Sequence, residues 1–266
     1  DIKGDLNDVV MNNSPIDIDK LIEGTNEILS ANRNSLQLFD MLHSMRQFDD
    51  LTYVHSVNVA LIASILGQWL KFSEKDIRIL TISGLLHDIG KIMIPNEILT
   101  KPGKLTVAEY NIMKQHVNFG YEKVKNQNID IRIKEACLLH HEKCDGTGYP
   151  FGLKSDHIPA VAKIIAIADV YDAMTSARVY RGALCPFEVI DTMYKDAFTK
   201  FEPEYILPFL KNVASSYINN DVRLSDGRIG TVVLINENAL SLPIVQCEDE
   251  FIDLSKTRGL TVSAIL

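Results

Sequence analysis

Residues 159–174 are PAVAKIIAIADVYDAM, and this stretch indicates what kind of domain the chain can form. Its apolar composition predicts a helix that begins at Pro159. Asp169 interrupts the apolar run, and its neighbours one helical turn earlier are apolar. A buried carboxylate without a partner costs several kcal/mol, so a cation is expected beside it, and a metal ion is the simplest choice. Asp172, one turn further on, is expected either to support that site or to face a bound molecule.

The chain from residue 17 to residue 219 is expected to be all-helical. Apolar residues recur at helical spacing in 17–48, which predicts two amphipathic helices. Residues 52–70 are apolar on nearly all sides, so this helix is expected at the centre of the domain. Shorter helices are predicted from Ser73 to about Gly90 and over 131–141. Helix starts are indicated by an N-cap, a capping box and prolines suited to a first turn: Ser73 with Asp76, Thr106 with Glu109, Pro186 and Pro203.

The last part of the chain has a different pattern. Short β-branched runs separated by Asp-Gly and Asn turn signals predict a small antiparallel sheet over 221–266. The expected fold class is therefore mainly α, with a helical domain and a small C-terminal antiparallel β appendage. Three parts are expected: an N-terminal helical segment or linker (1–50), the main helical domain (51–219) and a small β domain (220–266).

Composition limits the function. The chain has 266 residues, 46% of them hydrophobic, and a net charge of −8. An acidic chain without a basic tail is a poor DNA binder, because such binding needs Lys and Arg on phosphates. No apolar run approaches the ~18 residues of a membrane span, so direct membrane insertion is not expected. Four cysteines without a CxxC pair indicate a reducing, cytoplasmic compartment. Cys144 is expected to be a free thiol, because no activating pattern accompanies it.

The histidines call for a joint explanation. A single histidine on an apolar face usually belongs to the core, but five in one helical domain suggest a shared task. Neutral imidazole is the commonest metal ligand, and bundles build metal sites between facing helices. His and Asp that are adjacent can ligate one metal, or the carboxylate can bridge two. The candidate ligands are His55, His87, Asp88, His116, His140, His141 and Asp169.

Lys91 lies three residues beyond Asp88 and four beyond His87, on one face if the segment is helical. An ammonium group there can neutralise a phosphate oxygen or protonate a leaving oxygen. Taken alone, the same lysine is better explained as a complement to the helix dipole before Pro95.

Four segments, in this order, resemble the HD-GYP family of bacterial phosphodiesterases, a branch of the HD metal-dependent phosphohydrolases. They are YVHSVNVA (53–60), GLLHDIGK (84–91), HHEKCDGTGYPFGL (140–153) and IAIADVYDAMTSARVYR (165–181). The resemblance covers roughly residues 50–215. It implies a metal-dependent phosphodiesterase that hydrolyses cyclic di-GMP to pGpG or GMP through a metal-bridging hydroxide. It also implies that the seven candidate ligands hold two or three metals, often iron or manganese, with Asp88 as the bridge and Lys91 assisting the departing oxygen.

One departure from the family bears on the number of metals. Trinuclear members carry a glutamate one turn before the first histidine, where this chain has Leu51. Asp50 is one residue out of register with the face of His55. Two divalent ions, iron or manganese, are therefore expected rather than three.

The loop that follows His140 and His141 is expected to form the substrate wall. Gly148 allows close backbone approach, Tyr149 offers a flat face for guanine, and Pro150 stiffens the loop. Stacking on an aromatic ring contributes roughly 1–3 kcal/mol per base. The resemblance further implies basic contacts from Arg178 and Arg181, since arginine suits phosphate and guanine edges. Asp172 is included as a possible substrate contact.

Three alternatives remain open at this level. The chain could hydrolyse another cyclic dinucleotide, bind cyclic di-GMP without cleaving it, or use its histidines only as core residues. The sensor is less favoured because none of the seven ligand positions is lost. The first helices are expected to serve in a homodimer contact or as a linker from an upstream sensory domain. The sequence assigns no role to the β segment.

Overall fold

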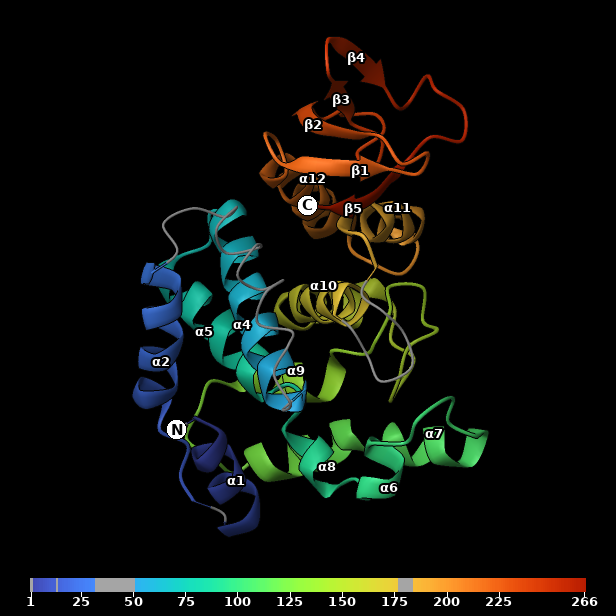
Figure 1. Cartoon of the computed structure of the whole chain (residues 1–266). Helices are drawn as coiled ribbons and strands as arrows, with labels where there is room; N and C mark the ends of the chain where they lie inside the picture. Colours follow the sequence, from blue (N-terminus) through green and yellow to red (C-terminus); the bar gives the residue numbers. More distant parts are fainter. Residues whose placement is uncertain (1, 13, 32–50, 177–183) are drawn as a thin grey trace.

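The computed structural model describes residues 2–12, 14–31, 51–176 and 184–266, which form a helical body and a five-stranded sheet (Figure 1). The helices are α1 (Ile2–Asn12), α2 (Ile18–Ala31), α4 (Leu51–Trp69), α5 (Glu74–Leu86), η2, a 3₁₀ helix (Ile89–Met93), α6 (Asn96–Leu99), α7 (Val107–Met113), α8 (His116–Val124), α9 (Ile131–Leu139), η3, also 3₁₀ (Ser155–His157), α10 (Ala160–Thr175), α11 (Pro186–Asp196) and α12 (Pro203–Ser216). The strands are β1 (Asp221–Leu224), β2 (Ile229–Leu234), β3 (Ile244–Cys247), β4 (Glu250–Asp253) and β5 (Val262–Ile265). The mainly-α class with a C-terminal antiparallel sheet is thus confirmed.

Helices α4, α5, α9 and α10 form the centre of the helical body (Figure 1). Many of their apolar residues are fully buried, among them Leu61 of α4, Leu80 of α5 and Ile165 of α10. Burying one such side chain stabilises the fold by about 1.5–3 kcal/mol. The prediction that the α4 segment is central is confirmed. These four helices also carry or precede most of the candidate ligands, so packing of the core brings the ligands together.

The predicted helix starts are confirmed. The side chain of Ser73 accepts a hydrogen bond from the backbone N–H of Asp76 at the start of α5. Thr106 and Glu109 form a complete capping box at the start of α7. Proline stands in the first turn of α11 and of α12.

The structure departs from the expected helices in two places. The helix expected to run to Gly90 ends at Leu86, and η2 follows after a turn. Apolar spacing does not distinguish the end of an α-helix from a tighter 3₁₀ segment, which explains this error. Helix α1 was not predicted. Of the two helices expected within 17–48, the first corresponds to α2, and the second lies outside the described residues.

The sheet has the strand order β4-β3-β2-β1-β5, and every neighbouring pair is antiparallel. A turn at Asp226-Gly227, where Gly227 has a φ of +94°, joins β1 to β2. Strand β5 packs on α11, and one hydrophobic core runs from the helices into the sheet through Val222 and Val245. The sheet begins close to the predicted boundary at 219/220, but the division into three parts stays a prediction.

Candidate metal centre

The candidate ligands form two clusters that share Asp88. One cluster contains Asp88, His116, His140 and His141, and the other contains His55, His87 and Asp88. Within each cluster the ligand atoms lie within 4.8 Å of one another. Asp169 lies beside both clusters, since its Oδ1 is 3.1 Å from His55 Nε2 and its Oδ2 is 3.8 Å from His141 Nδ1. The structure therefore brings together all seven side chains named from the sequence.

Asp88 turns one carboxylate oxygen toward each cluster. Its Oδ2 lies 3.2 Å from His87 Nε2 and 3.5 Å from His55 Nε2. Its Oδ1 lies 3.3 Å from His116 Nε2 and 3.7 Å from His140 Nε2. A carboxylate with this arrangement is placed to bridge two ions.

The backbone determines which ring nitrogen faces the clusters. Nδ1 of His87 lies 2.7 Å from the carbonyl oxygen of Gly84, and Nδ1 of His116 lies 2.7 Å from that of Met113. Nδ1 of His140 lies 3.0 Å from the carbonyl oxygen of Ala136. Because a carbonyl only accepts, each Nδ1 carries the proton and each Nε2 presents a lone pair to the centre. This outer hydrogen bond is typical of metal-binding histidines.

Two atoms at the centre lack a hydrogen-bond partner. Within the described chain, His87 Nε2 and Asp88 Oδ1 are buried and make no hydrogen bond. Leaving such groups unsatisfied is costly, and native proteins rarely do so without a bound ion or water. Imidazole nitrogens and carboxylate oxygens are the donors that divalent transition metals accept. The residues present therefore fit a metal centre.

The protonation states of His140, His141 and Asp88 also suit metal binding. Burial lowers the pKa of His140 to about 4, and burial together with His140 lowers the pKa of His141 well below its usual value. Burial acts to raise the pKa of Asp88, but His87 and the charge of Lys91 outweigh it and hold that pKa well below its usual range. Neutral imidazoles and an ionised carboxylate are the forms that ligate metals.

Asp172 orients His55 and is itself held by Asn58. Its Nδ1 lies 2.7 Å from Asp172 Oδ2, and the other oxygen of Asp172 accepts a hydrogen bond from Asn58 Nδ2 at 2.9 Å. Asp172 is buried. This placement favours a role in positioning His55 over the expected contact with substrate. Asn58 was not singled out from the sequence, although a polar residue one turn after His55 in an apolar helix was a usable signal.

Lys91 lies next to the shared carboxylate. Its Nζ donates a hydrogen bond to Asp88 Oδ2, and its side chain is 23% exposed. In a 3₁₀ helix, residues three apart lie one above the other, so η2 holds this pair together. Lys91 therefore spans the distance between the buried centre and solvent.

Close packing of η2 on α8 sets the distance between Asp88 and His116. A Cβ atom built on Gly90 would lie 2.0 Å from the carbonyl oxygen of His116 and 2.4 Å from the backbone nitrogen of Gly120. Only a glycine at position 90 permits this approach. Gly90 was noted from the sequence only as the end of a helix.

The loop after His141 lies against the metal centre. The ring of Tyr149 stacks on His141, with centroids 4.7 Å apart and planes at 29°. A Cβ atom on Gly148 would lie 2.4 Å from the Cα atom of Glu142, so the loop backbone runs directly over residues 141 and 142. The Tyr149–Pro150 peptide bond is cis. Lys114 Nζ lies 6.0 Å from the centre of the Tyr149 ring.

Several sequence-based expectations fall on residues that the structure does not describe. Arg178 and Arg181, the expected basic substrate contacts, lie outside the described residues. So does Asp50, while Leu51 is the first residue of α4.

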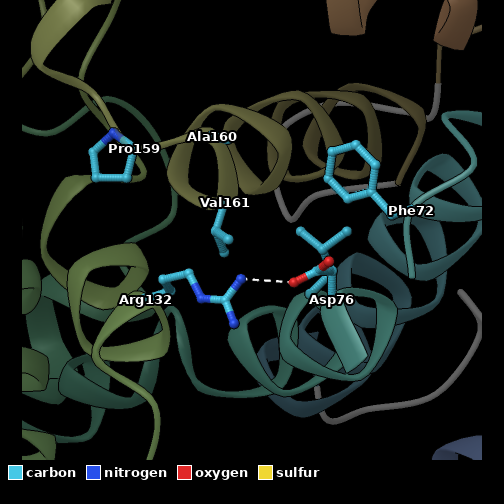
Figure 2. Close-up of a pocket in the computed structure, with 7 residues that line it drawn as sticks. Phe72, Asp76, Arg132, Pro159, Ala160 and Val161 are labelled. Carbon is cyan, nitrogen blue, oxygen red and sulfur yellow. Dashed lines mark hydrogen bonds and ion pairs between the residues drawn. The ribbon is translucent and has the colours of Figure 1, made fainter. Parts of the chain in front are cut away.

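A separate hollow of about 240 Å³ lies between α5, α9 and α10, and none of the candidate ligands lines it. Figure 2 shows Arg132 and Asp76 pointing toward each other across it, with Nη1 and Oδ1 2.7 Å apart. Asp130 binds the remaining side of the same guanidinium through Nε and Nη2. Because two carboxylates already engage Arg132, none of the described residues that line this hollow offers a free cationic group to an anion.

Comparison with known proteins identifies the class. The family model described as HD domain matches residues 25–205. The chain therefore belongs to the HD domain family. Several relatives are cyclic di-GMP phosphodiesterases, which confirms the expected resemblance to the HD-GYP phosphodiesterase branch.

Two relatives show the extent of the match. The cyclic di-GMP phosphodiesterase PA4108 of Pseudomonas aeruginosa is 36% identical over 203 residues, which are 76% of this chain and 49% of that protein. The cyclic di-GMP phosphodiesterase response regulator RpfG of Xanthomonas campestris is 36% identical over 197 residues, 73% of this chain and 52% of that protein. The chain thus spans about half the length of these curated relatives.

A further relative and a solved structure complete the comparison. The 3'3'-cGAMP-specific phosphodiesterase 2 of Vibrio cholerae is 32% identical over 188 residues, 69% of this chain and 36% of that protein. The structure of Bd1817, a HDG"Y"P protein from Bdellovibrio bacteriovorus, superposes with a TM-score of 0.58 at 19% identity. The superposition covers 78% of this chain and 69% of the Bd1817 chain, and it supports the fold alone. Among the described helices, none is both long and apolar enough to cross a membrane.

Proposed function

We propose that this domain is a metal-dependent phosphodiesterase that hydrolyses cyclic di-GMP to pGpG, GMP or both. The observation that carries the proposal is the pair of ligand clusters joined by Asp88, whose two oxygens face one cluster each. Relatives that match three quarters of the chain are named for this activity.

The proposed cofactor is a pair of divalent ions, iron or manganese, and the donor set of nitrogen and oxygen supports either. One ion would be held by His116, His140 and His141, the other by His55 and His87, with Asp88 shared and Asp169 adjacent to both. When bound, such ions polarise the phosphodiester and provide a nucleophilic water at neutral pH.

The chain's own residues supply the proton and the substrate contacts in this proposal. Lys91 holds a proton on Nζ beside Asp88 and is partly exposed, so it can donate to the departing 3′ oxygen. Tyr149, with Gly148 and Pro150, forms the wall against which a guanine stacks. Arg178 and Arg181 stay proposed phosphate or guanine contacts.

A second substrate has specific support. The Vibrio cholerae relative is named for 3'3'-cGAMP, so a mixed guanine–adenine dinucleotide is the alternative substrate. A sensor without catalysis is less well supported, because both clusters are complete and Lys91 is in place.

The setting of the enzyme is also proposed. All four cysteines are free, which supports a reducing, cytoplasmic compartment. A homodimer, or an upstream sensory domain joined through the first helices, stays a prediction.

The test is turnover of cyclic di-GMP, and in parallel of 3'3'-cGAMP, by protein purified anaerobically and loaded with Fe(II) or Mn(II). Asp88→Asn is the control, since it removes the shared charge. Linear products from the parent alone support the proposal, and the ratio of the two rates identifies the substrate. A parent that holds two ions per chain and forms no product would refute it.

A further inference from the structure

Glu142 is a buried acid that the proposed chemistry does not use. Its residue is 4% exposed, and it follows the metal-ligand residue His141 directly. No lysine or arginine in the described part of the chain forms an ion pair with it. Burying a carboxylate without a cation is costly unless hydrogen bonds satisfy its oxygens.

The backbone of the loop after His141 satisfies the hydrogen-bonding capacity of this carboxylate. Oε1 accepts the N–H of Phe151 at 2.7 Å and of Gly152 at 3.1 Å, and Oε2 accepts the N–H of Leu153 at 2.8 Å. Hydrogen bonds to an ionised acceptor are roughly twice as strong as neutral ones. Glu142 thus holds three consecutive residues immediately after Pro150.

The loop is held on the other side of Pro150 as well. The N–H of Tyr149 donates to the carbonyl oxygen of His141 at 3.2 Å, and the Tyr149 ring stacks on the His141 ring. Residues 141 and 142 therefore fix Tyr149 from both directions. A ligand histidine and the loop aromatic are parts of one hydrogen-bonded unit.

We infer that Glu142 is a positioning residue: its three backbone hydrogen bonds hold Tyr149 over the metal centre, in place to contact the substrate. The inference rests on the proposed function, because it assigns Tyr149 to the substrate wall. A positioning role of Glu142 differs from a purely structural role in one respect. Loss of Glu142 should weaken substrate binding through Tyr149 while the metal ions and the fold stay intact.

Glu142→Gln is the main variant. An amide keeps one acceptor oxygen, and its NH₂ group faces one of the backbone N–H groups, so the three bonds cannot all be kept. If Tyr149 is no longer held, KM should rise roughly 5- to 150-fold, the equivalent of losing one base stacked on an aromatic ring. The kcat value should change much less, and the metal content should stay at the parent level.

Glu202→Gln is the matched control. Glu202, the residue before α12, is also a hydrogen-bonded acid. It accepts from Ser155 and Lys163, so its contacts lie beyond Leu153. The same change from carboxylate to amide there should leave KM at the parent value. Glu142→Asp keeps the charge on a shorter side chain and provides a milder variant if the glutamine variant does not fold.

The decisive experiment is a double-mutant cycle of Glu142→Gln with Tyr149→Ala, read as KM, kcat and metal ions per chain. If Glu142 acts through Tyr149, the second change adds little to the KM of the first. Additive effects, an unchanged KM or a loss of metal in Glu142→Gln would overturn the inference. Parent turnover is measured first, since a parent that holds two ions per chain and forms no product refutes the proposed function and this inference with it.

Discussion

Gly90→Ala tests how the metal centre is assembled. A Cβ atom at position 90 would lie 2.0 Å from the carbonyl oxygen of His116 and 2.4 Å from the backbone nitrogen of Gly120. Both neighbours are backbone atoms, so no side chain can rotate away. To reach ordinary contact at 3.4 Å from 2.0 Å, η2 and α8 must separate by about 1.4 Å.

That movement acts directly on the ligands. Asp88 precedes η2 and His116 begins α8, and their ligand atoms are 3.3 Å apart in the structure. Metal–ligand distances tolerate deviations of only about 0.2 Å. The cluster of His116, His140 and His141 should therefore bind its ion at least about 10- to 100-fold more weakly. Overpacking should also lower the free energy of unfolding by about 1–3 kcal/mol.

Gly120→Ala is the matched control across the same contact. A Cβ atom at position 120 would meet the backbone nitrogen of Gly90 at 3.3 Å and Ile89 Cγ2 at 3.5 Å, so a shift of a few tenths of an ångström suffices. Inside α8, alanine is also more stabilising than glycine by about 0.5–1 kcal/mol. The measurements are metal ions per chain after Mn(II) loading and dialysis, and thermal unfolding. Two tightly held ions in Gly90→Ala, or equal losses in both variants, would refute the reasoning.

Three further predictions follow from the same geometry. His55→Ala and His140→Ala should each keep one ion per chain, because His55 and His140 belong to different clusters. Loss of both ions in either variant would contradict the two-cluster arrangement. Asp172→Asn should leave Nδ1 of His55 without its carboxylate partner, so a metal titration should show the affinity for one ion reduced roughly 10- to 100-fold. An unchanged affinity would argue against a role of Asp172 in positioning His55. Lys101 and the backbone hydrogen bond at Thr106 hold the pKa of Glu109 at about 2, below its usual 4.5. The stability that Glu109 provides is therefore fully present above about pH 4.5 and is lost as the pH falls through 2. In urea unfolding, the free energy of unfolding of Glu109→Gln should lie below that of the parent at neutral pH. This difference should shrink only as the pH falls from about 4.5 to 2.

Much of the molecule could be predicted from local pattern. Ser73 and the pair Thr106 and Glu109 marked helix starts because capping depends on residues only three apart. Asp169 was recognisable as a candidate ligand because a carboxylate in an apolar helix requires a partner wherever that helix packs. The strand pattern of the last segment was equally local. The end of α5 was misplaced because apolar spacing looks alike at an α-helical end and a 3₁₀ turn.

The sequence by itself determined which residue types could bind metal, where most helices begin, and that a sheet follows them. Only the tertiary structure decided that Asp88 turns one oxygen to each cluster, that Asp172 supports His55 from 117 residues away, and that Glu142 holds the loop after Pro150. The reason is physical. Capping and periodicity act over a few residues, whereas these roles depend on where packed helices place groups that are remote in the chain or on how a loop folds back on its own backbone.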